Sequence, residues 1–318
     1  MVRTKVALRP LLVVSLLAVG LLISAPFAAA PPPGGGSPPA NPAIAMFDNV
    51  GGSSGDALRV MNTDGSNNVA IFSGCTINNP SWSPSGGAIA FINDCDNGAL
   101  WRIDVSIVNG VPTGSNPHQL AASTVCGSRC WDPAWSPQGD FVSVGGGSTN
   151  PSILLIDAIT GSAQVLYTAG AGSNVVYSTW SSDGTRLAVQ EKEGASGQHV
   201  IRIVERSTGN VLQTLVRGVF VVITHMDWAR QSVEKLAITA FPCGACYGLV
   251  YIVDILTDTF TQPIPGNALK AGQNAPSWSP ENAKLVYAES GKIKTITLAT
   301  GKLTTLATGD KNFPDWRR

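Results

Sequence analysis

The six cysteines are the residues of this chain whose types and spacing most readily suggest chemistry. Two of them form a Cys-x-x-Cys motif, which can hold a disulfide, bind zinc or exchange thiols and disulfides. The chain has no second Cys-x-x-Cys and only three histidines. Disulfides are therefore favoured over zinc binding or redox catalysis. The six are Cys75, Cys95, Cys126, Cys130, Cys243 and Cys246.

Two other chemistries are weaker candidates. Residues 93–98, Asn-Asp-Cys-Asp-Asn-Gly, place carboxylates two apart, as in a calcium loop, but lack the downstream bidentate glutamate and suit an ordinary turn. A serine hydrolase is excluded, because the repeat leaves no residues to build an α/β-hydrolase domain with its nucleophile elbow, and the chain has only His118, His199 and His225 as histidines. We therefore predict no metal, no cofactor and no catalytic residue.

A repeated tryptophan motif indicates which elements position these residues. Residues 79–91 read as a strand ending at Trp82, a Ser-Pro-Ser-Gly turn and an apolar strand. Related motifs end at five later tryptophans, and the intervals between successive tryptophans are 53, 45, 48, 50 and 38 residues. A period in the forties with short strands inside each unit is typical of propeller blades, in which the large rings fill the space between blades. The repeated residues are Trp82, Trp135, Trp180, Trp228, Trp278 and Trp316.

The two ends of the repeat region predict how the ring closes. Residues 44–47, 58–61 and 69–72 read as the second, third and fourth strands of a blade that lacks its first strand. Residues 312–318 supply only a first strand. Together they complete one blade and leave no exposed end blade. We predict an all-β, six-bladed propeller of four-stranded antiparallel blades, closed by the C-terminal innermost strand.

The Pro-x-Trp-Ser-Pro-x-Gly…Ile-Ala-Phe repeat resembles that of TolB and related exported six-bladed propellers over residues 43–318. TolB is a periplasmic member of the Tol-Pal envelope system, and its propeller holds the peptidoglycan-associated lipoprotein. TolB also carries an N-terminal α/β domain, where this chain has only a short linker. The resemblance therefore implies a TolB-like propeller and leaves membership of a Tol-Pal system open.

The N-terminal residues predict export. Residues 1–30 combine three basic residues, a long apolar run and a final Ala-Ala-Ala, the layout of a secretory signal, which is either cleaved or kept as a membrane anchor. Residues 31–42 are a Pro/Gly-rich linker. Without residues 1–30 the chain keeps 18 Lys and Arg against 21 Asp and Glu, and it has no basic run, so a nucleic-acid partner is disfavoured. We expect a periplasmic or secreted monomer.

The predicted strand order places all six cysteines in loops on one face of the propeller. We predict the pairs Cys75–Cys95, Cys126–Cys130 and Cys243–Cys246 on this face. The residues three before each tryptophan should ring the channel mouth there, either as a recognition site or simply in contact with water. Arg129 and Trp131 are candidate partner contacts beside the ring. The ring comprises Asn79, Asp132, Tyr177, His225, Ala275 and Phe313.

The function that these features favour is that of an exported, non-enzymatic binding or scaffold module with a protein partner in the cell envelope or outside the cell. The alternatives are a small-molecule or glycan binder, and a propeller lyase or hydrolase with its site in the central funnel. Converging carboxylates, arginine or histidine would favour an enzyme. An apolar, Trp/Tyr-rich rim would favour a protein or sugar partner.

Overall fold

The computed structural model describes residues 43–48, 56–109, 111–147, 150–265 and 272–318. The predicted signal or anchor (1–30) and linker (31–42) lie outside these residues. Within the described part of the chain, no helix has the length and apolarity needed to cross a membrane.

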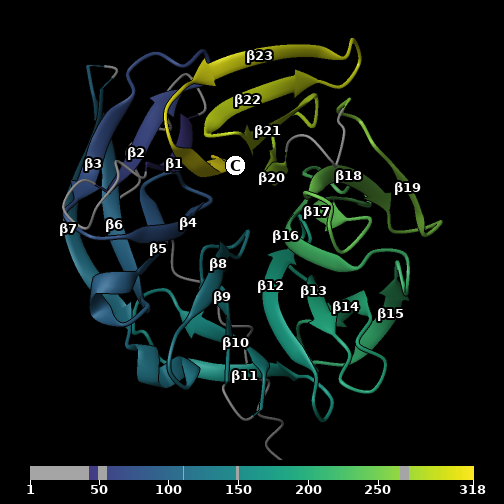
Figure 1. Ribbon diagram of the computed structural model, residues 1–318. Coiled ribbons are helices and arrows are strands. Elements are labelled where there is room, and N and C mark those ends of the chain that lie inside the picture. The colour runs from purple at the N-terminus through teal and green to yellow at the C-terminus, as the bar shows by residue number, and fades with distance from the viewer. Residues whose placement is uncertain (1–42, 49–55, 110, 148–149, 266–271) are drawn as a thin grey trace, which may run out of the picture. The chain divides into compact units, whose positions relative to one another are not determined.

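Six four-stranded antiparallel sheets form a ring of blades around a central channel (Figure 1). Blade 1 comprises β24 (Lys311–Trp316), β1 (Ala43–Asp48), β2 (Ala57–Asn62) and β3 (Val69–Ser73). Blade 2 comprises β4 (Ile77–Trp82), β5 (Ala88–Asn93), β6 (Ala99–Val108) and β7 (Val111–Ala121). Blade 3 comprises β8 (Trp131–Trp135), β9 (Phe141–Gly146), β10 (Ser152–Asp157) and β11 (Ala163–Thr168).

The remaining blades follow the same order from the innermost strand outward. Blade 4 comprises β12 (Asn174–Trp180), β13 (Arg186–Lys192), β14 (His199–Glu205) and β15 (Val211–Leu215). Blade 5 comprises β16 (Val222–Trp228), β17 (Lys235–Phe241), β18 (Leu249–Asp254) and β19 (Thr259–Thr261). Blade 6 comprises β20 (Gln273–Trp278), β21 (Lys284–Glu289), β22 (Lys292–Thr297) and β23 (Lys302–Ala307).

The ring closes as the sequence predicts. Strand β24 pairs antiparallel with β1, with Trp316 opposite Ile44 and Lys311 opposite Asp48. The C-terminal strand thereby becomes the innermost strand of the blade whose other three strands begin the repeat region. Closure by hydrogen-bonded strands removes the unpaired edges that an open array would present.

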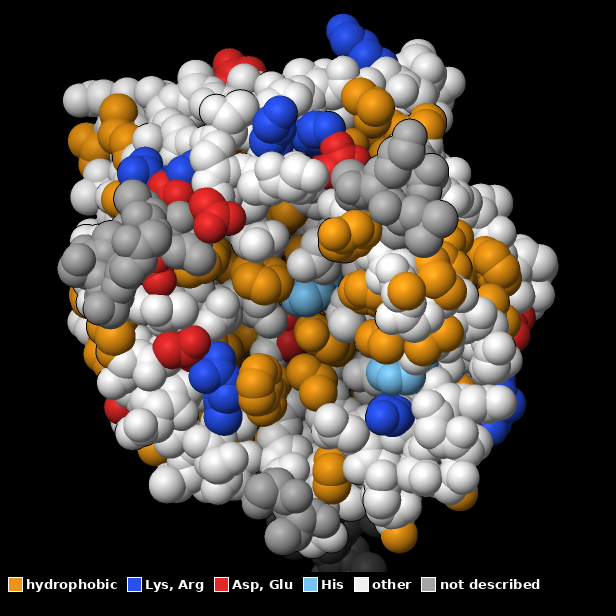
Figure 2. All heavy atoms as spheres, in the orientation of Figure 1, with side chains coloured by type: hydrophobic (Ala, Val, Ile, Leu, Met, Phe, Trp, Pro, Cys, Tyr) orange, Lys and Arg blue, Asp and Glu red, His pale blue; other side chains and the backbone are white. Residues whose placement is uncertain are grey.

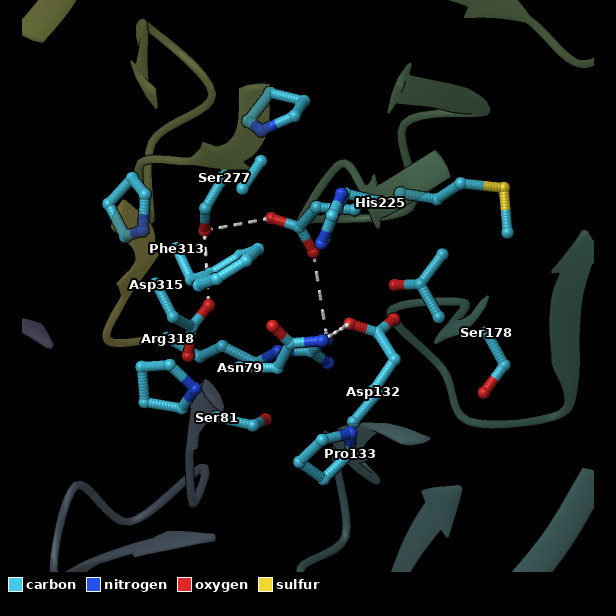
Figure 3. A pocket seen from close by; sticks show the side chains of 18 residues that line it. Asn79, Ser81, Asp132, Pro133, Ser178, His225, Ser277, Phe313, Asp315 and Arg318 are labelled. Atoms are coloured by element: carbon cyan, nitrogen blue, oxygen red, sulfur yellow. Dashed lines mark hydrogen bonds and ion pairs between the residues drawn. The ribbon is translucent and has the colours of Figure 1, made fainter. Parts of the chain in front are cut away.

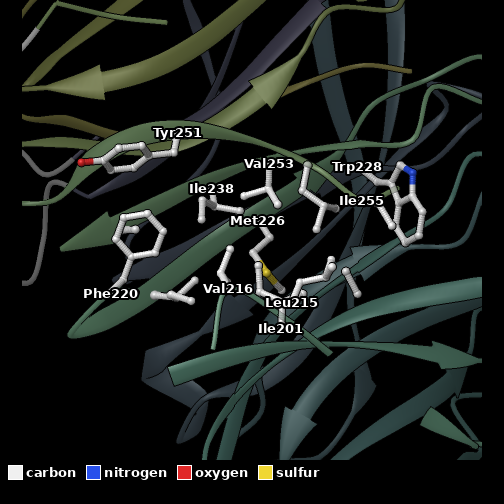
Figure 4. Close-up of a cluster of buried hydrophobic side chains, with 14 of the residues drawn as sticks. Ile201, Leu215, Val216, Phe220, Met226, Trp228, Ile238, Tyr251, Val253 and Ile255 are labelled. Carbon is white, nitrogen blue, oxygen red and sulfur yellow. The ribbon is translucent and has the colours of Figure 1, made fainter. Parts of the chain in front are cut away.

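The six repeated tryptophans are structural, also as predicted, and each is at most 3% exposed. They pack in the apolar layers between neighbouring blades. Figure 4 shows one such layer, in which Ile201 and Leu215 of blade 4 meet Trp228 and Val253 of blade 5. Most of these tryptophans are followed by a serine, whose hydroxyl has a structural role in the turn. The hydroxyl of Ser83, for example, accepts the backbone N–H of Ala88 at 3.0 Å and so closes the turn to the next strand.

Candidate binding site at the channel mouth

Every innermost strand is bulged just before its tryptophan. The pairing with the second strand shifts register there in all six blades. A bulge bends the strand and redirects the side chains that follow. The bulges therefore determine how the predicted ring residues meet the channel.

Five of the six predicted ring residues have left-handed backbone conformations, which are uncommon for residues with a side chain. Tyr177 is the exception: it lies inside the bulge of β12 but is not among the residues with positive φ. The φ angles are 50° at Asn79, 45° at Asp132, 33° at His225, 48° at Ala275 and 50° at Phe313.

These five residues line one pocket at the centre of the ring, of about 550 Å³ including its opening to solvent. Figure 2 shows this hollow, with a histidine side chain visible inside it. Tyr177 does not line the pocket and instead packs against His225, with the ring centroids 4.6 Å apart and the ring planes tilted by 52°. The structure thus brings the predicted ring together, with five members on the wall and Tyr177 behind one of them.

Asp132 and Asn79 connect the neighbouring blades 3 and 2 on one side of the mouth. The Asn79 amide donates to Asp132 Oδ1 at 2.8 Å (Figure 3). Burial raises the pKa of Asp132 well above its usual range, the nearby charge of Asp315 adds to this, and the Asn79 hydrogen bond opposes it. The side-chain oxygen of Asn79 is buried and accepts no hydrogen bond from the described residues.

An aromatic row lies across the mouth from this pair. The His225 ring lies between Tyr177 and Phe313, with its centroid 5.0 Å from that of Phe313. Burial lowers the pKa of His225 to about 4, and the Asn274 side chain only partly offsets this. His225 is therefore neutral at pH 7, and its Nδ1 is buried without a partner among the described residues.

A second ring of polar residues, which the sequence analysis missed, occupies the position directly before each tryptophan. In five of six blades this side chain accepts the backbone N–H of the next blade's tryptophan. The sixth blade has Ala134, which has no side-chain acceptor. The five distances to the tryptophan N are 3.1 Å from Ser81, 3.2 Å from Thr179, 2.8 Å from Asp227, 3.0 Å from Ser277 and 2.7 Å from Asp315. The sequence signal for this second ring was the short polar residue directly before the tryptophan in five of the six repeats.

One carboxylate of this second ring, that of Asp227, is held by arginines. Arg230 binds Asp227 through both of its terminal nitrogens, at 2.8 and 2.9 Å. Arg318 lies 3.9 Å from the same carboxylate and also lines the pocket. Burial and the charge of Asp227 raise the pKa of Asp315 to about 6. This ring mainly connects blades, whereas the first ring faces the opening.

Arg129 and Trp131 lie outside the pocket, beside the mouth. The Arg129 guanidinium lies 4.4 Å from the Trp131 ring centroid and pairs with Asp94 at 2.5 Å. Trp131 remains 44% exposed. The contact with Asp94 ties the start of β8 to the loop between β5 and β6, so Arg129 has a structural partner within the chain.

The three predicted disulfides are confirmed, with Cα–Cα distances of 5.6 Å for Cys75–Cys95 and 5.1 Å for the other two pairs. All six cysteines lie in loops that either connect two blades or join the second and third strands of one blade. Since the strands of a blade alternate in direction, these loops share the face that carries the mouth. This face is called the disulfide face below.

The Asp94 and Asp96 carboxylates already have protein donors. Asn78 donates to Asp94 at 2.8 Å, and Trp101 Nε1 donates to Asp96 at 2.8 Å. In the described part of the chain, no group of three or more His, Cys, Asp or Glu residues is arranged to hold a metal ion.

Solved structures with the same architecture include TolB propellers. TolB from Acinetobacter baumannii aligns with a TM-score of 0.64 and 18% identity over 87% of this chain, which spans 66% of that protein. A putative TolB from Agrobacterium tumefaciens aligns with a TM-score of 0.61 and 13% identity, covering 87% of this chain and 99% of that one. Hydrazine synthase from Kuenenia stuttgartiensis aligns with a TM-score of 0.57 and 14% identity, covering 80% and 73%. No protein-family model and no curated protein matches the sequence.

The chain is thus a six-bladed β-propeller with a polar and aromatic pocket at one end of its channel. Its fold is that of the TolB propellers, as the repeated Trp-Ser-Pro motif suggested.

Proposed function

We propose that this protein is an exported, non-enzymatic binding module that holds a segment of an envelope or extracellular protein at the channel mouth of its disulfide face. The observation that carries the proposal is the left-handed backbone at Asn79, Asp132, His225, Ala275 and Phe313. Such conformations cost of order 1–3 kcal/mol each and persist where the surrounding structure enforces them, often at binding sites.

The fold alone does not require this strain. Blade 4 forms the same bulge without a positive φ at Tyr177. Unpartnered polar atoms in the same place, Asn79 Oδ1 and His225 Nδ1, add a second cost that a ligand can remove. A preorganised ring with unmet hydrogen-bonding groups is what a recognition site needs.

Export is supported by the cysteines as well as by the predicted N-terminal signal. All six cysteines form disulfides, which persist in oxidising compartments such as the periplasm or the extracellular space. We therefore place the site in the envelope or outside the cell.

A small-molecule or glycan site, or an enzyme, is the second candidate. It is favoured by one observation: Asp132, neutral His225 and Arg318 line the same pocket. Buried, perturbed titratable groups in one cavity are typical of such sites. A partner protein that competes with small ligands for the pocket would support the first candidate over the second.

Affinity capture tests the proposal. The tagged chain would be recovered from cross-linked envelope and secreted fractions beside a double variant, Asp132→Ala/His225→Ala. We expect one protein to be recovered with the parent and lost with the variant. Equal recovery with both forms, or no specific protein with either, would overturn the proposal. An Asp310→Ala chain serves as control, since Asp310 is exposed in the loop between β23 and β24 on the same face.

A further inference from the structure

Of the three carboxylates that line the pocket, Asp132 is the one with neither an ion pair nor a hydrogen bond from a backbone N–H among the described residues. Asp227 is bound by Arg230, and Asp315 accepts the backbone N–H of Trp82 at 2.7 Å. Asp132 forms no ion pair with any described residue, and its hydrogen bond comes from the neutral Asn79 amide. Its carboxylate therefore lacks a counter-ion in the protein.

The wall opposite Asp132 is aromatic. In Figure 3 the side chains of His225 and Phe313 lie across the pocket from those of Asp132 and Asn79. Tyr177 supports the His225 ring from behind, at 4.6 Å between centroids. The faces of aromatic rings attract positive charge, and this attraction strengthens where water is excluded.

The charges that line the pocket also favour a cation. Asp132, Asp227 and Asp315 face a single lining guanidinium, that of Arg318, and Arg230 stands behind Asp227. The sum is negative when the carboxylates are ionised, so an anionic ligand would meet repulsion.

We infer that the channel mouth binds a positively charged nitrogen, with Asp132 as its counter-ion and the rings of His225 and Phe313 as its aromatic wall. The chemistry is that of a primary ammonium group, supplied either by a lysine side chain of a partner protein or by a free amine. For the lysine source, the inference rests on the proposed function and deepens it. The unpartnered oxygen of Asn79, next to Asp132, can accept a second hydrogen from the ammonium group.

The test is a titration of the purified full chain, followed by two-dimensional NMR. The probes are a blocked pentapeptide, Gly-Gly-Lys-Gly-Gly, the same peptide with acetylated lysine, n-butylamine, and n-butanol as its neutral analogue. We expect the lysine peptide and butylamine to bind, and acetylation or the alcohol to weaken binding at least tenfold. Acetylated and free lysine binding equally well would overturn the inference, as would no binding of either cationic probe.

Substitutions test whether the amine binds at the channel mouth. Asp132→Asn should weaken amine binding at least tenfold, whereas Asp310→Asn, an equal charge change on the same face, should leave it unchanged. Phe313→Leu keeps every charge and should weaken binding about threefold to tenfold, which preserves the test if Asp132→Asn misfolds. Equal losses in Asp132→Asn and Asp310→Asn would overturn the inference, because they would indicate a general charge effect.

The affinity capture and the amine titration can fail independently of each other, so their outcomes distinguish the two proposals. Butylamine and the lysine peptide binding without any captured protein would uphold the cation site, assign it to free amines and remove the proposed function. A captured protein that depends on Asp132 and His225, without amine binding, would uphold the proposed function and remove this inference.

Discussion

Asp315 Oδ2 accepts a hydrogen bond from the backbone N–H of Trp82 at 2.7 Å, although 233 residues separate the two in sequence. Asp315 lies in β24, which closes blade 1, and Trp82 ends the innermost strand of blade 2. The same link joins four further pairs of neighbouring blades. The ring is thus closed twice, once by strand pairing and once by a circle of side chains around the channel.

Removal of the Asp315 carboxylate should weaken this closure. We expect Asp315→Ala to lower the free energy of unfolding by about 1–3 kcal/mol, since it leaves the Trp82 N–H without its acceptor. Urea unfolding measures the change, and Asp310→Ala, an exposed aspartate five residues earlier, is the control. A loss no larger than that of the control would show that the side-chain circle contributes nothing.

Ala134 is the gap in the circle, and filling it should stabilise the protein. In Ala134→Ser, the new hydroxyl stands where Ser81 and Thr179 accept a tryptophan N–H in other blades. We expect a gain of about 0.5–1.5 kcal/mol in urea unfolding. Ser81→Ala, the reverse change, should cost a similar amount. A destabilised Ala134→Ser would contradict the equivalence of these positions.

His225 should make stability depend on pH. Burial holds its pKa at about 4, below the ordinary value of 6.5. The unfolded chain therefore binds a proton between these values that the folded chain does not, so the His225 contribution is complete above about pH 6.5 and is lost as pH falls toward 4.

We expect His225→Phe to lose less stability than the parent over this interval. Phenylalanine suits the site, because Phe313 adopts the same left-handed conformation in blade 1. Unfolding curves at several pH values measure the difference, with His118→Gln, in the outermost strand of blade 2, as the control. Parallel pH profiles of parent and His225→Phe would refute the assignment.

The three disulfides should contribute unequally. Cys75–Cys95 spans 20 residues, whereas Cys243–Cys246 spans three. By the loop-entropy relationship the longer loop contributes roughly 3 kcal/mol and the shorter one about 2. Paired serine substitutions, followed by thermal unfolding, should therefore cost more at 75/95 than at 243/246. The opposite order would mean that the small loop matters through contacts and not through chain entropy.

Much of the fold was predictable, because the repeat combines strong local signals. The Trp-Ser-Pro-x-Gly motif specifies a buried tryptophan side chain, a turn closed by the serine hydroxyl, and a second strand. Because the repeat region begins with the second strand of a blade and ends with a first strand, it also predicts closure by β24. The cysteine pairs followed from assigning each cysteine to a loop.

The site was only partly predictable. The position three before each tryptophan pointed to the ring. The left-handed conformations, however, arise from bulges, and a residue type such as that of Phe313 does not predict a bulge. The second ring was missed because Ser277 or Asp315 looks like any polar strand residue. The role of these residues exists only once the next blade brings a tryptophan N–H to within hydrogen-bonding distance.

Site-specific photo-crosslinking tests the central claim, a protein partner at the channel mouth, most directly. A photoreactive phenylalanine analogue would replace Trp131, which is 44% exposed on the disulfide face, or Ile159, which is 71% exposed in the turn between β10 and β11. That turn lies on the opposite face of the same blade. We predict a discrete crosslinked protein from position 131 in the native envelope or secreted fraction, lost with Asp132→Ala/His225→Ala, and none from position 159. The same products from both positions, or none from position 131, would contradict the account.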